Sequence, residues 1–449
     1  MTTTTYYASL VANHKPKMYA ALDYIWNHPE IGYKEWNTSA YLENEFEKLG
    51  YVVKRAGDIP GFSAQIDTGR PGPVIGVMGE LDALMCATHP DADPETHAVH
   101  ACGHVMQVSA MLGVAAALAE PGALEGLSGS VRFLAVPAEE TIDLAYRQAL
   151  VEKGVISYMA GKIEFLKRGF FDGVDMAMMF HLDTEEGKLF KFISGCDGCI
   201  TKHFVYRGVA AHAGGAPHKG VNALYAASLG LSACNALRET FQEKDYVRYH
   251  PIITEGGVAA NAIPAVVSLD TYVRAATLPA MCSTNDKINR AIAASAAALG
   301  CHVEVDDKPG NFPFHADENL SDCCQNVIEE LFGKDQIIYA GWDTQSSDVG
   351  DISSIMPVMQ NLCMGASGNQ HGEDYQITDK EKAVVNPAKV MTAMIGKLLS
   401  EDAKGARKIK EEYKPVFGSK EEYFEAINEI QKKRELVTYQ DGNQVTLQF

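Results

Sequence analysis

Met106-Gln-Val-Ser-Ala-Met-Leu-Gly-Val-Ala-Ala-Ala-Leu118 is apolar on every side and rich in alanine, so we expect it to form a buried helix. It lies between two apolar runs of strand length, Val74–Met78 and Val131–Val136, and a third such run follows at Met176–Phe180. Short apolar strands that alternate with helices are typical of an α/β sheet with helices packed on it. This stretch therefore predicts an α/β fold for the first 200 residues.

The pattern changes at about residue 198. We expect a strand, a helix, two strands, a helix and a strand over the ranges 200–206, 222–240, 252–258, 266–273, 285–299 and 302–305. This β-α-β-β-α-β order is the split motif of a ferredoxin-like domain. Helix and strand signals resume after Phe314. We therefore predict a discontinuous α/β domain, residues 1–197 and 313–449, with an inserted ferredoxin-like α+β domain at 198–312.

The composition excludes several classes of protein. The 449 residues carry 39 Lys and Arg against 58 Asp and Glu, and the net charge of −19 argues against broad binding to nucleic acid or anionic membranes. No apolar run reaches the roughly 18 residues that cross a bilayer. The ten scattered cysteines do not suggest a secreted disulfide framework. We expect no nucleic-acid or membrane partner and a cytoplasmic location.

The first candidate site is His100-Ala-Cys-Gly-His104, directly before the predicted buried helix. Because only a glycine separates Cys102 from His104, a tight turn can direct the thiolate and the imidazole at one metal ion. The alternative is a buried cysteine beside a histidine that caps the helix. The motif alone leaves both interpretations open.

The second candidate site is Pro137-Ala-Glu139-Glu140, which ends an apolar run. Carboxylates at the C-terminal edge of an α/β sheet lie where such folds place their sites. Because successive side chains of an extended strand point to opposite sides, one carboxylate can ligate a metal while its neighbour transfers protons. The alternative is a solvated strand end, where paired glutamates are common.

Two isolated histidines complete a candidate metal centre. His181 ends an apolar run of strand length, and His371 ends a glycine-rich stretch. Each alone is ordinarily a structural or surface histidine. Together with Cys102, His104 and Glu140 they provide five ligands of mixed N, O and S type, a set that suits two divalent ions with one shared ligand.

Five motifs, taken in order, resemble a known family. They are Glu80-Leu-Asp82-Ala-Leu, His100-Ala-Cys-Gly-His104, Pro137-Ala-Glu139-Glu140, Gly208-Val-Ala-Ala-His212-Ala and Asn261-Ala-Ile-Pro264. This order is similar to that of the aminoacylase and glutamate-carboxypeptidase metallopeptidases, and the cysteine motif resembles their amidohydrolase branch. Ser347-Asp-Val-Gly-Asp351 looks most like the aminobenzoyl-glutamate hydrolases of that branch. The resemblance runs from about residue 15 to 400 and implies a zinc-peptidase-like catalytic domain with an inserted lid and dimerisation domain.

The resemblance also implies a role for each candidate residue. The ligands of two divalent ions, Mn or Zn, would be Cys102 as the bridging thiolate, with His104, Glu140, His181 and His371. Glu139 would be the general base that deprotonates a metal-bound water, and Asp82 would orient the ligands from behind.

The inserted domain would complete this site. In family dimers the histidine that matches His212 reaches the active site of the partner and steadies the oxyanion, so the resemblance implies a homodimer. Asn261 and Arg274 would hold a free carboxylate of the substrate. The implied reaction is cleavage of the amide bond of a small N-acyl or N-aroyl amino acid by a metal-activated water.

Two departures and two rival functions stay open. The branch usually continues its Cys-Gly-His motif with Asp or Asn, whereas Val105-Met106-Gln107 follow here, and Gln-His-Gly-Glu-Asp surrounds His371. Both departures bear on the surroundings of the ligands and on substrate preference. The chain could instead be a dipeptidase or deaminating relative with the same metals, or a non-catalytic subunit that supports a partner. Because Glu139 and all five ligands are present, the sequence argues against the non-catalytic alternative.

Overall fold

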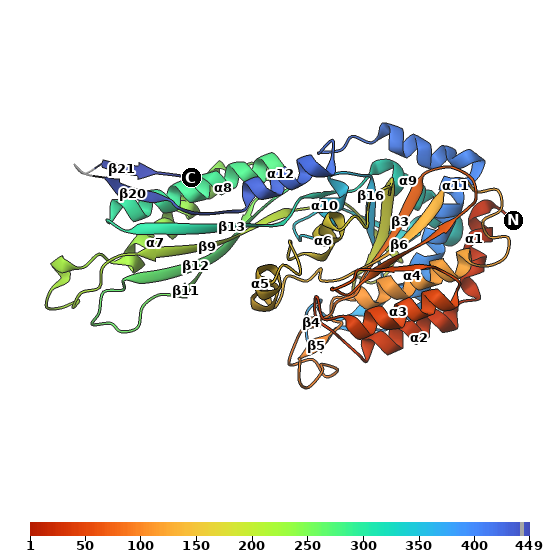
Figure 1. Ribbon diagram of the computed structural model, residues 1–449, viewed down its shortest axis with the longest axis horizontal. Helices are drawn as coiled ribbons and strands as arrows, with labels where there is room; N and C mark the ends of the chain where they lie inside the picture. The colour runs from red at the N-terminus through yellow and green to blue at the C-terminus, as the bar shows by residue number, and fades with distance from the viewer. Residues whose placement is uncertain (441–443) are drawn as a thin grey trace. The chain divides into compact units, whose positions relative to one another are not determined.

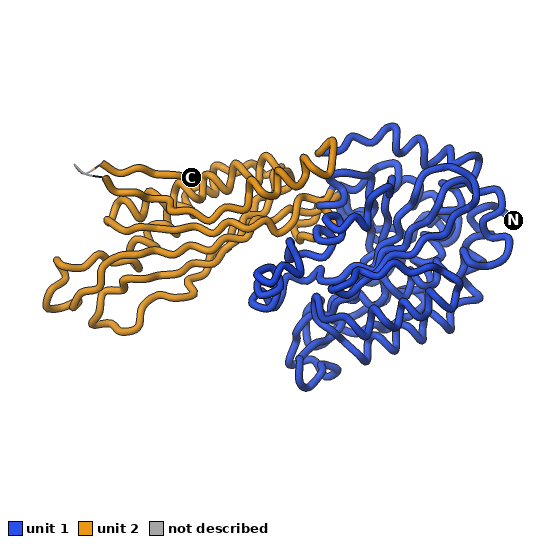
Figure 2. The backbone as a smooth tube through the Cα atoms, viewed as in Figure 1, with its two compact units in different colours: residues 1–194, 315–342, 351–416 blue, residues 195–314, 343–350, 417–449 orange. Residues whose placement is uncertain are grey.

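A computed structural model describes residues 1–440 and 444–449 of the chain. The chain divides into two compact units (Figure 2). Unit 1 consists of Met1–Ser194, His315–Trp342 and Asp351–Val416, and unit 2 consists of Gly195–Phe314, Asp343–Gly350 and Phe417–Phe449. Within the described ranges, we find no helix with the length and apolar character needed to span a membrane.

Unit 1 is built on a mixed sheet with the strand order β1-β2-β6-β3-β7-β16-β8-β14, in which β15 also pairs with β8. The strands are β1 (Val53–Arg55), β2 (Phe62–Asp67), β3 (Val74–Glu80), β6 (Ser130–Val136), β7 (Met176–Leu182), β8 (Phe190–Cys196), β14 (Phe314–His315), β15 (Ile337–Asp343) and β16 (Val358–Cys363). The three predicted apolar runs form β3, β6 and β7. These strands and β16 run parallel, so their carboxyl ends meet at one edge of the sheet.

Helix α4 (His104–Leu118) is the buried helix that the sequence predicts, and all of its side chains are buried. It packs against β3 and β7, and helices α2 and α11 cover it (Figure 1). The other helices of this part of the chain are α1 (Thr3–Ala12), α2 (Lys15–Trp26), α3 (Trp36–Lys48), α5 (Leu144–Glu152), α6 (Gly161–Lys167), α9 (Glu318–Phe332), α10 (Val349–Ser353) and α11 (Asn386–Glu412).

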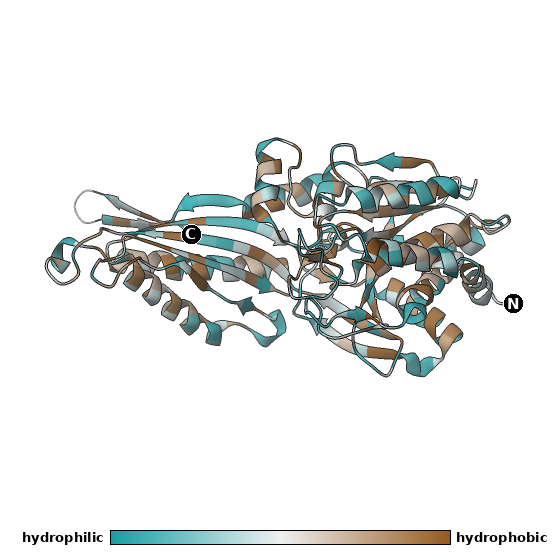
Figure 3. Ribbon diagram, turned by 90° about the horizontal axis from the view of Figure 1, so that it is seen from below, coloured by the Kyte–Doolittle hydropathy of each residue, from teal (hydrophilic) through white to brown (hydrophobic). Residues whose placement is uncertain are grey.

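The outer helices bury one face only. Along α9 the buried residues Leu320, Cys324, Val327 and Ile328 recur at helical spacing. Colouring by hydropathy accordingly alternates between brown and teal along the helices (Figure 3). Amphipathic helices therefore pack around one helix, α4, that is apolar all round.

Unit 2 contains an antiparallel sheet of order β10-β12-β9-β13-β19, in which β11 also pairs with β12. Its inserted part comprises β9 (Gly198–Arg207), α7 (Ala223–Ala236), β10 (Arg248–Tyr249), β11 (Ile252–Glu255), β12 (Val266–Ala275), α8 (Leu278–Ala298) and β13 (His302–Asn311). Both helices pack on β9 and β12. This chain order is the β-α-β-β-α-β pattern that the sequence predicts, with the second strand split into β10 and β11.

The C-terminal segment corrects the predicted domain boundaries. The sequence predicts that residues 417–449 belong to the α/β domain, but they group with unit 2, as do residues 343–350. After α12 (Lys420–Ile430), strand β19 (Lys432–Glu435) pairs antiparallel with β13, and a hairpin of β20 (Val437–Gln440) and β21 (Gln444–Leu447) follows. The sequence of β19 is charged throughout, as suits an edge strand held mainly by backbone hydrogen bonds, so hydrophobic alternation could not reveal it.

Candidate metal centre

The predicted ligands meet at the carboxyl edge of the parallel strands in unit 1. Glu139 and Glu140 follow the end of β6, His181 lies near the end of β7, and His371 follows β16. His104 is the first residue of α4. Because these strands are neighbours in the sheet, residues that are hundreds of positions apart come together.

Three groups of potential ligands lie within the described part of unit 1, and in each group the ligand atoms are within 4.8 Å of one another. The groups are Cys102–His104–His181, Cys102–Glu140–His371 and His104–Glu139–Glu140. Cys102 belongs to two of them, which is the arrangement required of a ligand shared by two metal ions. The structure therefore brings together all five predicted ligands and Glu139.

The turn before α4 presents Cys102 to this cluster. Gly103 has φ +88, and a Cβ atom at this position would contact the Tyr375 hydroxyl and the Leu182 side chain, so glycine is required on both conformational and steric grounds. Cys102 Sγ lies 3.4 Å from His181 Nε2. His181 Nδ1 lies 3.0 Å from the Leu182 carbonyl, which places the ring proton on Nδ1 and leaves Nε2 as the donor atom.

His371 is held against the same turn. Its backbone N–H donates to the Ala101 carbonyl at 2.9 Å, and its Nε2 lies 3.2 Å from Glu140 Oε1. The side chain of His371 is 56% exposed, whereas that of His104 is 1% exposed. The cluster is therefore open to solvent on the His371 side and closed on the His104 side.

Asp82 connects two of the ligands from behind. Its Oδ1 lies 3.2 Å from His104 Nδ1, and its Oδ2 accepts a hydrogen bond from the Glu140 N–H at 2.9 Å. These contacts leave His104 Nε2 facing the cluster and fix the start of the Glu140 side chain. Asp82 thus occupies the position that the resemblance implies for it.

Glu139 and Glu140 do not point to opposite sides of a strand, as the sequence predicts. Strand β6 ends at Val136, and Ala138 has φ +58 in the left-handed region. Glu139 Oε2 lies 4.0 Å from His104 Nε2, and both carboxylates belong to one ligand group. The prediction is wrong because the turn at Ala138 breaks the two-residue period of the strand.

Burial and neighbouring charges set the protonation of this cluster. Burial raises the pKa of the Cys102 thiol, so the thiolate forms there when a bound cation offsets its charge. Burial and the nearby His104 lower the pKa of His181, which keeps its imidazole neutral as a ligand must be. Burial opposes the charged form of His104 as well, but the Glu80 carboxylate outweighs it and raises the pKa of His104 well above its usual value.

These residues fit a pair of divalent ions. They offer thiolate, imidazole and carboxylate donors, a mixture that borderline divalent metals accept. His104 Nε2 and Glu140 Oε1 are shielded from solvent and make no hydrogen bond of proper geometry. A bound cation would satisfy both atoms, which otherwise stay desolvated without compensation.

A buried network behind His104 was not predicted from the sequence. Glu80 pairs with Lys162 Nζ, accepts a hydrogen bond from Gln107 Nε2 at 2.7 Å, and lies 3.1 Å from His104 Nε2. Burial opposes the ionised form of Glu80, but Lys162 and His104 outweigh it and lower the pKa of Glu80 to about 2. Gln107 is the departure noted after the Cys-Gly-His motif. Its spacing of three residues from His104 on one helix is the signal that could have linked the two.

The predicted lid residues lie in unit 2. His212 is exposed, and its Nδ1 accepts hydrogen bonds from the N–H groups of Gly214 and Gly215 at 3.2 and 2.9 Å. The Asn261 carbonyl accepts a hydrogen bond from the Ala213 N–H at 3.0 Å. His212 and Asn261 are therefore on adjoining loops.

Arg274 lies at the opposite end of β12 from these loops. It is aligned with Cys199 at the start of β9, whereas Asn261 precedes Val266 at the start of β12. Eight residues of extended strand, roughly 26 Å, separate Val266 from Arg274. Arg274 donates to the Thr344 carbonyl at 3.2 Å. The two predicted carboxylate-binding residues thus do not lie together within unit 2.

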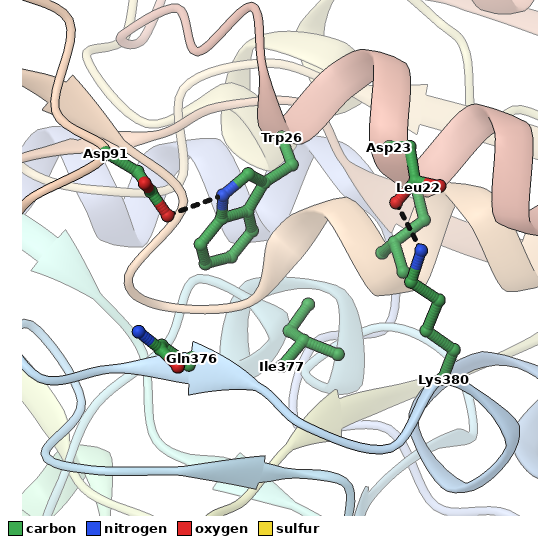
Figure 4. Close-up of a pocket in the computed structure, with 7 residues that line it drawn as sticks. All are labelled: Leu22, Asp23, Trp26, Asp91, Gln376, Ile377 and Lys380. Atoms are coloured by element: carbon green, nitrogen blue, oxygen red, sulfur yellow. Dashed lines mark hydrogen bonds and ion pairs between the residues drawn. The ribbon is translucent and has the colours of Figure 1, made fainter.

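A cavity of about 270 Å³ in unit 1 lies apart from the ligand cluster. It is lined by Leu22, Asp23, Trp26, Asp91, Gln376, Ile377 and Lys380 (Figure 4). The Trp26 indole N–H donates to Asp91 at 3.2 Å, and Lys380 pairs with Asp23. Because these polar groups satisfy one another rather than converge on the cavity, the ligand cluster is the better candidate site.

Comparisons with known proteins agree with this geometry. The profile described as peptidase family M20/M25/M40 matches residues 76–397. One of the two p-aminobenzoyl-glutamate hydrolase chains of Escherichia coli (strain K12) is 30% identical over 286 residues, which cover 62% of this chain and 54% of that protein. The chain thus spans about half the length of that relative. The Xaa-Arg dipeptidase of Mus musculus is 28% identical over 366 residues, 78% of this chain and 77% of that protein.

A solved structure shares the fold. A dinuclear metal-binding peptidase of the M20 family from Bacillus subtilis superimposes with a TM-score of 0.66 at 19% identity. The superposition covers 86% of this chain and 99% of that protein. Because unit 1 alone makes up a smaller share of the chain than this, the likeness extends into unit 2.

Proposed function

Since the chain belongs to peptidase family M20/M25/M40, we propose that it is a metal-dependent amidohydrolase that cleaves the amide bond of an N-acyl or N-aroyl amino acid. Membership confirms the family resemblance that the five motifs predict, and the fold class predicted with it. The observation that carries the proposed activity is the convergence of the five predicted ligands beside Glu139. The names of two relatives, an aminobenzoyl-glutamate hydrolase and a dipeptidase, support an amide substrate.

The proposed cofactor is a pair of divalent ions, Mn²⁺ or Zn²⁺. Cys102, shared by two ligand groups, would bridge them, and one ion would also take His104 and His181 while the other takes Glu140 and His371. When bound, such ions lower the pKa of a water molecule towards neutrality and polarise the scissile carbonyl.

Glu139 is the proposed general base. Its carboxylate is 16% exposed and lies 4.0 Å from His104 Nε2, at the border between the buried ligands and solvent. From there it can take a proton from the attacking water and return it to the leaving amine. Asp82 keeps its role of orienting His104 and Glu140 from behind.

The proposed homodimer rests on the geometry of unit 2. Asn261 and Arg274 lie at opposite ends of β12, so two chains are needed if both are to hold one substrate carboxylate, and His212 would then act across the interface. Strand β11 lies at the edge of the sheet with Ile252 and Ile253 exposed by 51% and 41%. An edge strand with apolar side chains can pair with its copy about a two-fold axis.

The division of roles between the adjacent carboxylates tests the proposed function. We expect Glu139→Gln to keep both metal ions but to lose turnover by about a hundredfold or more, because it removes the base. We expect Glu140→Gln to lose metal. Metal analysis and turnover of a panel of N-acyl, N-benzoyl and p-aminobenzoyl amino acids decide this. Equal metal content in both variants would contradict the assignment.

The same panel tests the second candidate, a dipeptidase. The Xaa-Arg dipeptidase relative covers 78% of this chain and favours including Xaa-Arg dipeptides beside the acylated amino acids. Turnover of dipeptides alone would replace the proposed substrate class while leaving the metal site and the base unchanged.

Mixing of inactive variants tests the role of His212 across a dimer. We expect Glu139→Gln and His212→Ala, each inactive alone, to recover towards half the wild-type activity per dimer after exchange of chains, because one heterodimer site has both groups intact. If exchange is proven by mass and no activity returns, His212 does not act in the site of its partner.

A further inference from the structure

The turn that carries Glu139 and Glu140 has an uncommon backbone conformation. Ala138, directly before the pair, is fully buried with φ +58. The left-handed region is disfavoured for residues that have a Cβ atom, so neighbouring groups must hold Ala138 there. Two buried charged side chains, from segments far apart in the chain, contact its N–H and its carbonyl.

Glu35, the residue before α3, accepts a hydrogen bond from the Ala138 N–H at 2.8 Å through Oε1. Its Oε2 is shielded from solvent and has no hydrogen-bond partner. Arg147 in α5 donates from Nη1 to the Ala138 carbonyl at 3.3 Å. Opposite charges therefore lie at the two ends of one residue and align both of its peptide groups.

Arg147 also reaches further along the turn. It donates to the carbonyl of Glu140 and, at 2.7 Å, to that of Met159. Its guanidinium lies 5.5 Å from the centre of the Tyr33 ring, and a side chain in place of Gly32 would collide with it. The position of the guanidinium is thus fixed by packing as well as by hydrogen bonds.

We propose that Glu35 and Arg147 are positioning residues for the Glu139-Glu140 pair. They hold the turn in the conformation that brings Glu140 to the ligand cluster and Glu139 beside it. The part that concerns Glu139 rests on the proposed function, whereas the part that concerns Glu140 is a statement about metal binding alone. Asp82 supports the far end of the turn by accepting the Glu140 N–H.

The chain offers a matched control in Glu164 of α6. This carboxylate is 3% exposed, accepts two backbone N–H groups from residues 157–158 at 2.8 and 3.1 Å, and pairs with Arg168 at 2.7 Å. It resembles Glu35 in burial and in the kind of contacts it makes within the same unit, but its contacts are on other segments. Its loss should cost stability without moving the turn.

The test measures Co²⁺ and Mn²⁺ affinity of the full-length protein. We expect Glu35→Ala and Arg147→Met to weaken metal affinity by roughly tenfold or more and, at saturating metal, to lower kcat by a similar factor with little change in KM. Glu35→Gln keeps an acceptor oxygen for the Ala138 N–H, so we expect it to lose about threefold at most. Glu164→Gln should bind metal as the wild type does.

Urea unfolding and the visible spectrum of the Co²⁺-loaded protein separate positioning from stability. If Glu35→Ala and Arg147→Met are destabilised like Glu164→Gln but keep wild-type metal affinity and an unchanged spectrum, the proposal is wrong. If Arg147→Met does not fold, the contrast between Glu35→Ala and Glu35→Gln decides. A protein that hydrolyses no acyl amino acid would overturn the proposed function, and the metal affinities would still decide whether Glu35 and Arg147 position Glu140.

Discussion

Each unit of the molecule contains a buried lysine paired with a buried carboxylate. Lys162 pairs with Glu80 in unit 1, and Lys202 pairs with Asp307 in unit 2; none of the four side chains is more than 1% exposed. Carboxamide side chains assist both pairs, Gln107 in unit 1 and two asparagines in unit 2. The two pairs therefore have the same chemistry and comparable desolvation.

Their surroundings differ. Glu80 lies 3.1 Å from His104 Nε2, so the first pair borders the candidate metal centre. Asp307 instead meets Asn285 and Asn289 of α8 and, at 3.6 Å, Arg434 of β19. Buried ion pairs add little net stability over apolar side chains of similar size. The comparison suggests that the first pair serves the ligands, whereas the second joins the C-terminal strand to the core of unit 2.

The largest expected effect comes from breaking either pair. Lys162→Met and Lys202→Met each leave a carboxylate buried without its cation, which should lower the free energy of unfolding by about 3–5 kcal/mol. Urea denaturation measures this loss. Metal affinity separates the two variants, because only Lys162→Met disturbs the neighbour of His104. Equal metal affinity in both variants would remove the distinction between the pairs.

A somewhat smaller effect is expected from pH, and only in unit 2. Burial lowers the pKa of Lys202 from 10.5 to about 8, against the opposing effect of Asp307. Between these values the unfolded chain binds more protons than the folded one, so the contribution of Lys202 to stability rises with pH, by at most about 3 kcal/mol.

The measurement is the difference in unfolding free energy between the wild type and Lys202→Met/Asp307→Leu from pH 7.5 to 10.5. The subtraction matters because buried tyrosines and cysteines, whose pKa values are raised, contribute the opposite slope. Arg434 stays charged over this range and Asp286 stays ionised, so neither adds a step. A difference that does not grow with pH would show that Lys202 stays fully protonated.

The smallest expected effect sharpens the comparison most. Replacing both partners by apolar residues removes the charges without leaving one unpaired, so Lys202→Met/Asp307→Leu should be nearly neutral in stability. Lys162→Met/Glu80→Leu should be equally well folded but bind metal roughly 10–100-fold more weakly, because His104 loses its neighbour. Calorimetric metal titration checks this. Unchanged affinity would mean that Glu80 is structural only.

Much of the candidate site was predictable because its residues stand in short motifs at strand ends. Cys102 and His104 share one turn, and Glu139 and Glu140 directly follow an apolar strand. Parallel strands bring such ends to one edge whatever the rest of the chain does, so the five ligands can be assembled from the sequence. The same reasoning failed for the orientation of Glu139 and Glu140, because the left-handed φ of Ala138 has no local sequence signal.

By itself, the sequence determined the α/β class, the inserted β-α-β-β-α-β block and the ligand set, since hydrophobic periodicity and short motifs are local properties. Only the tertiary structure decided that β19 completes the sheet of unit 2, that Lys162 neutralises Glu80 beside His104, and that Arg147 holds the turn of Glu140. Those contacts join segments that no pattern connects. They exist because a charge shut away from water must find its partner in space, wherever in the chain that partner lies.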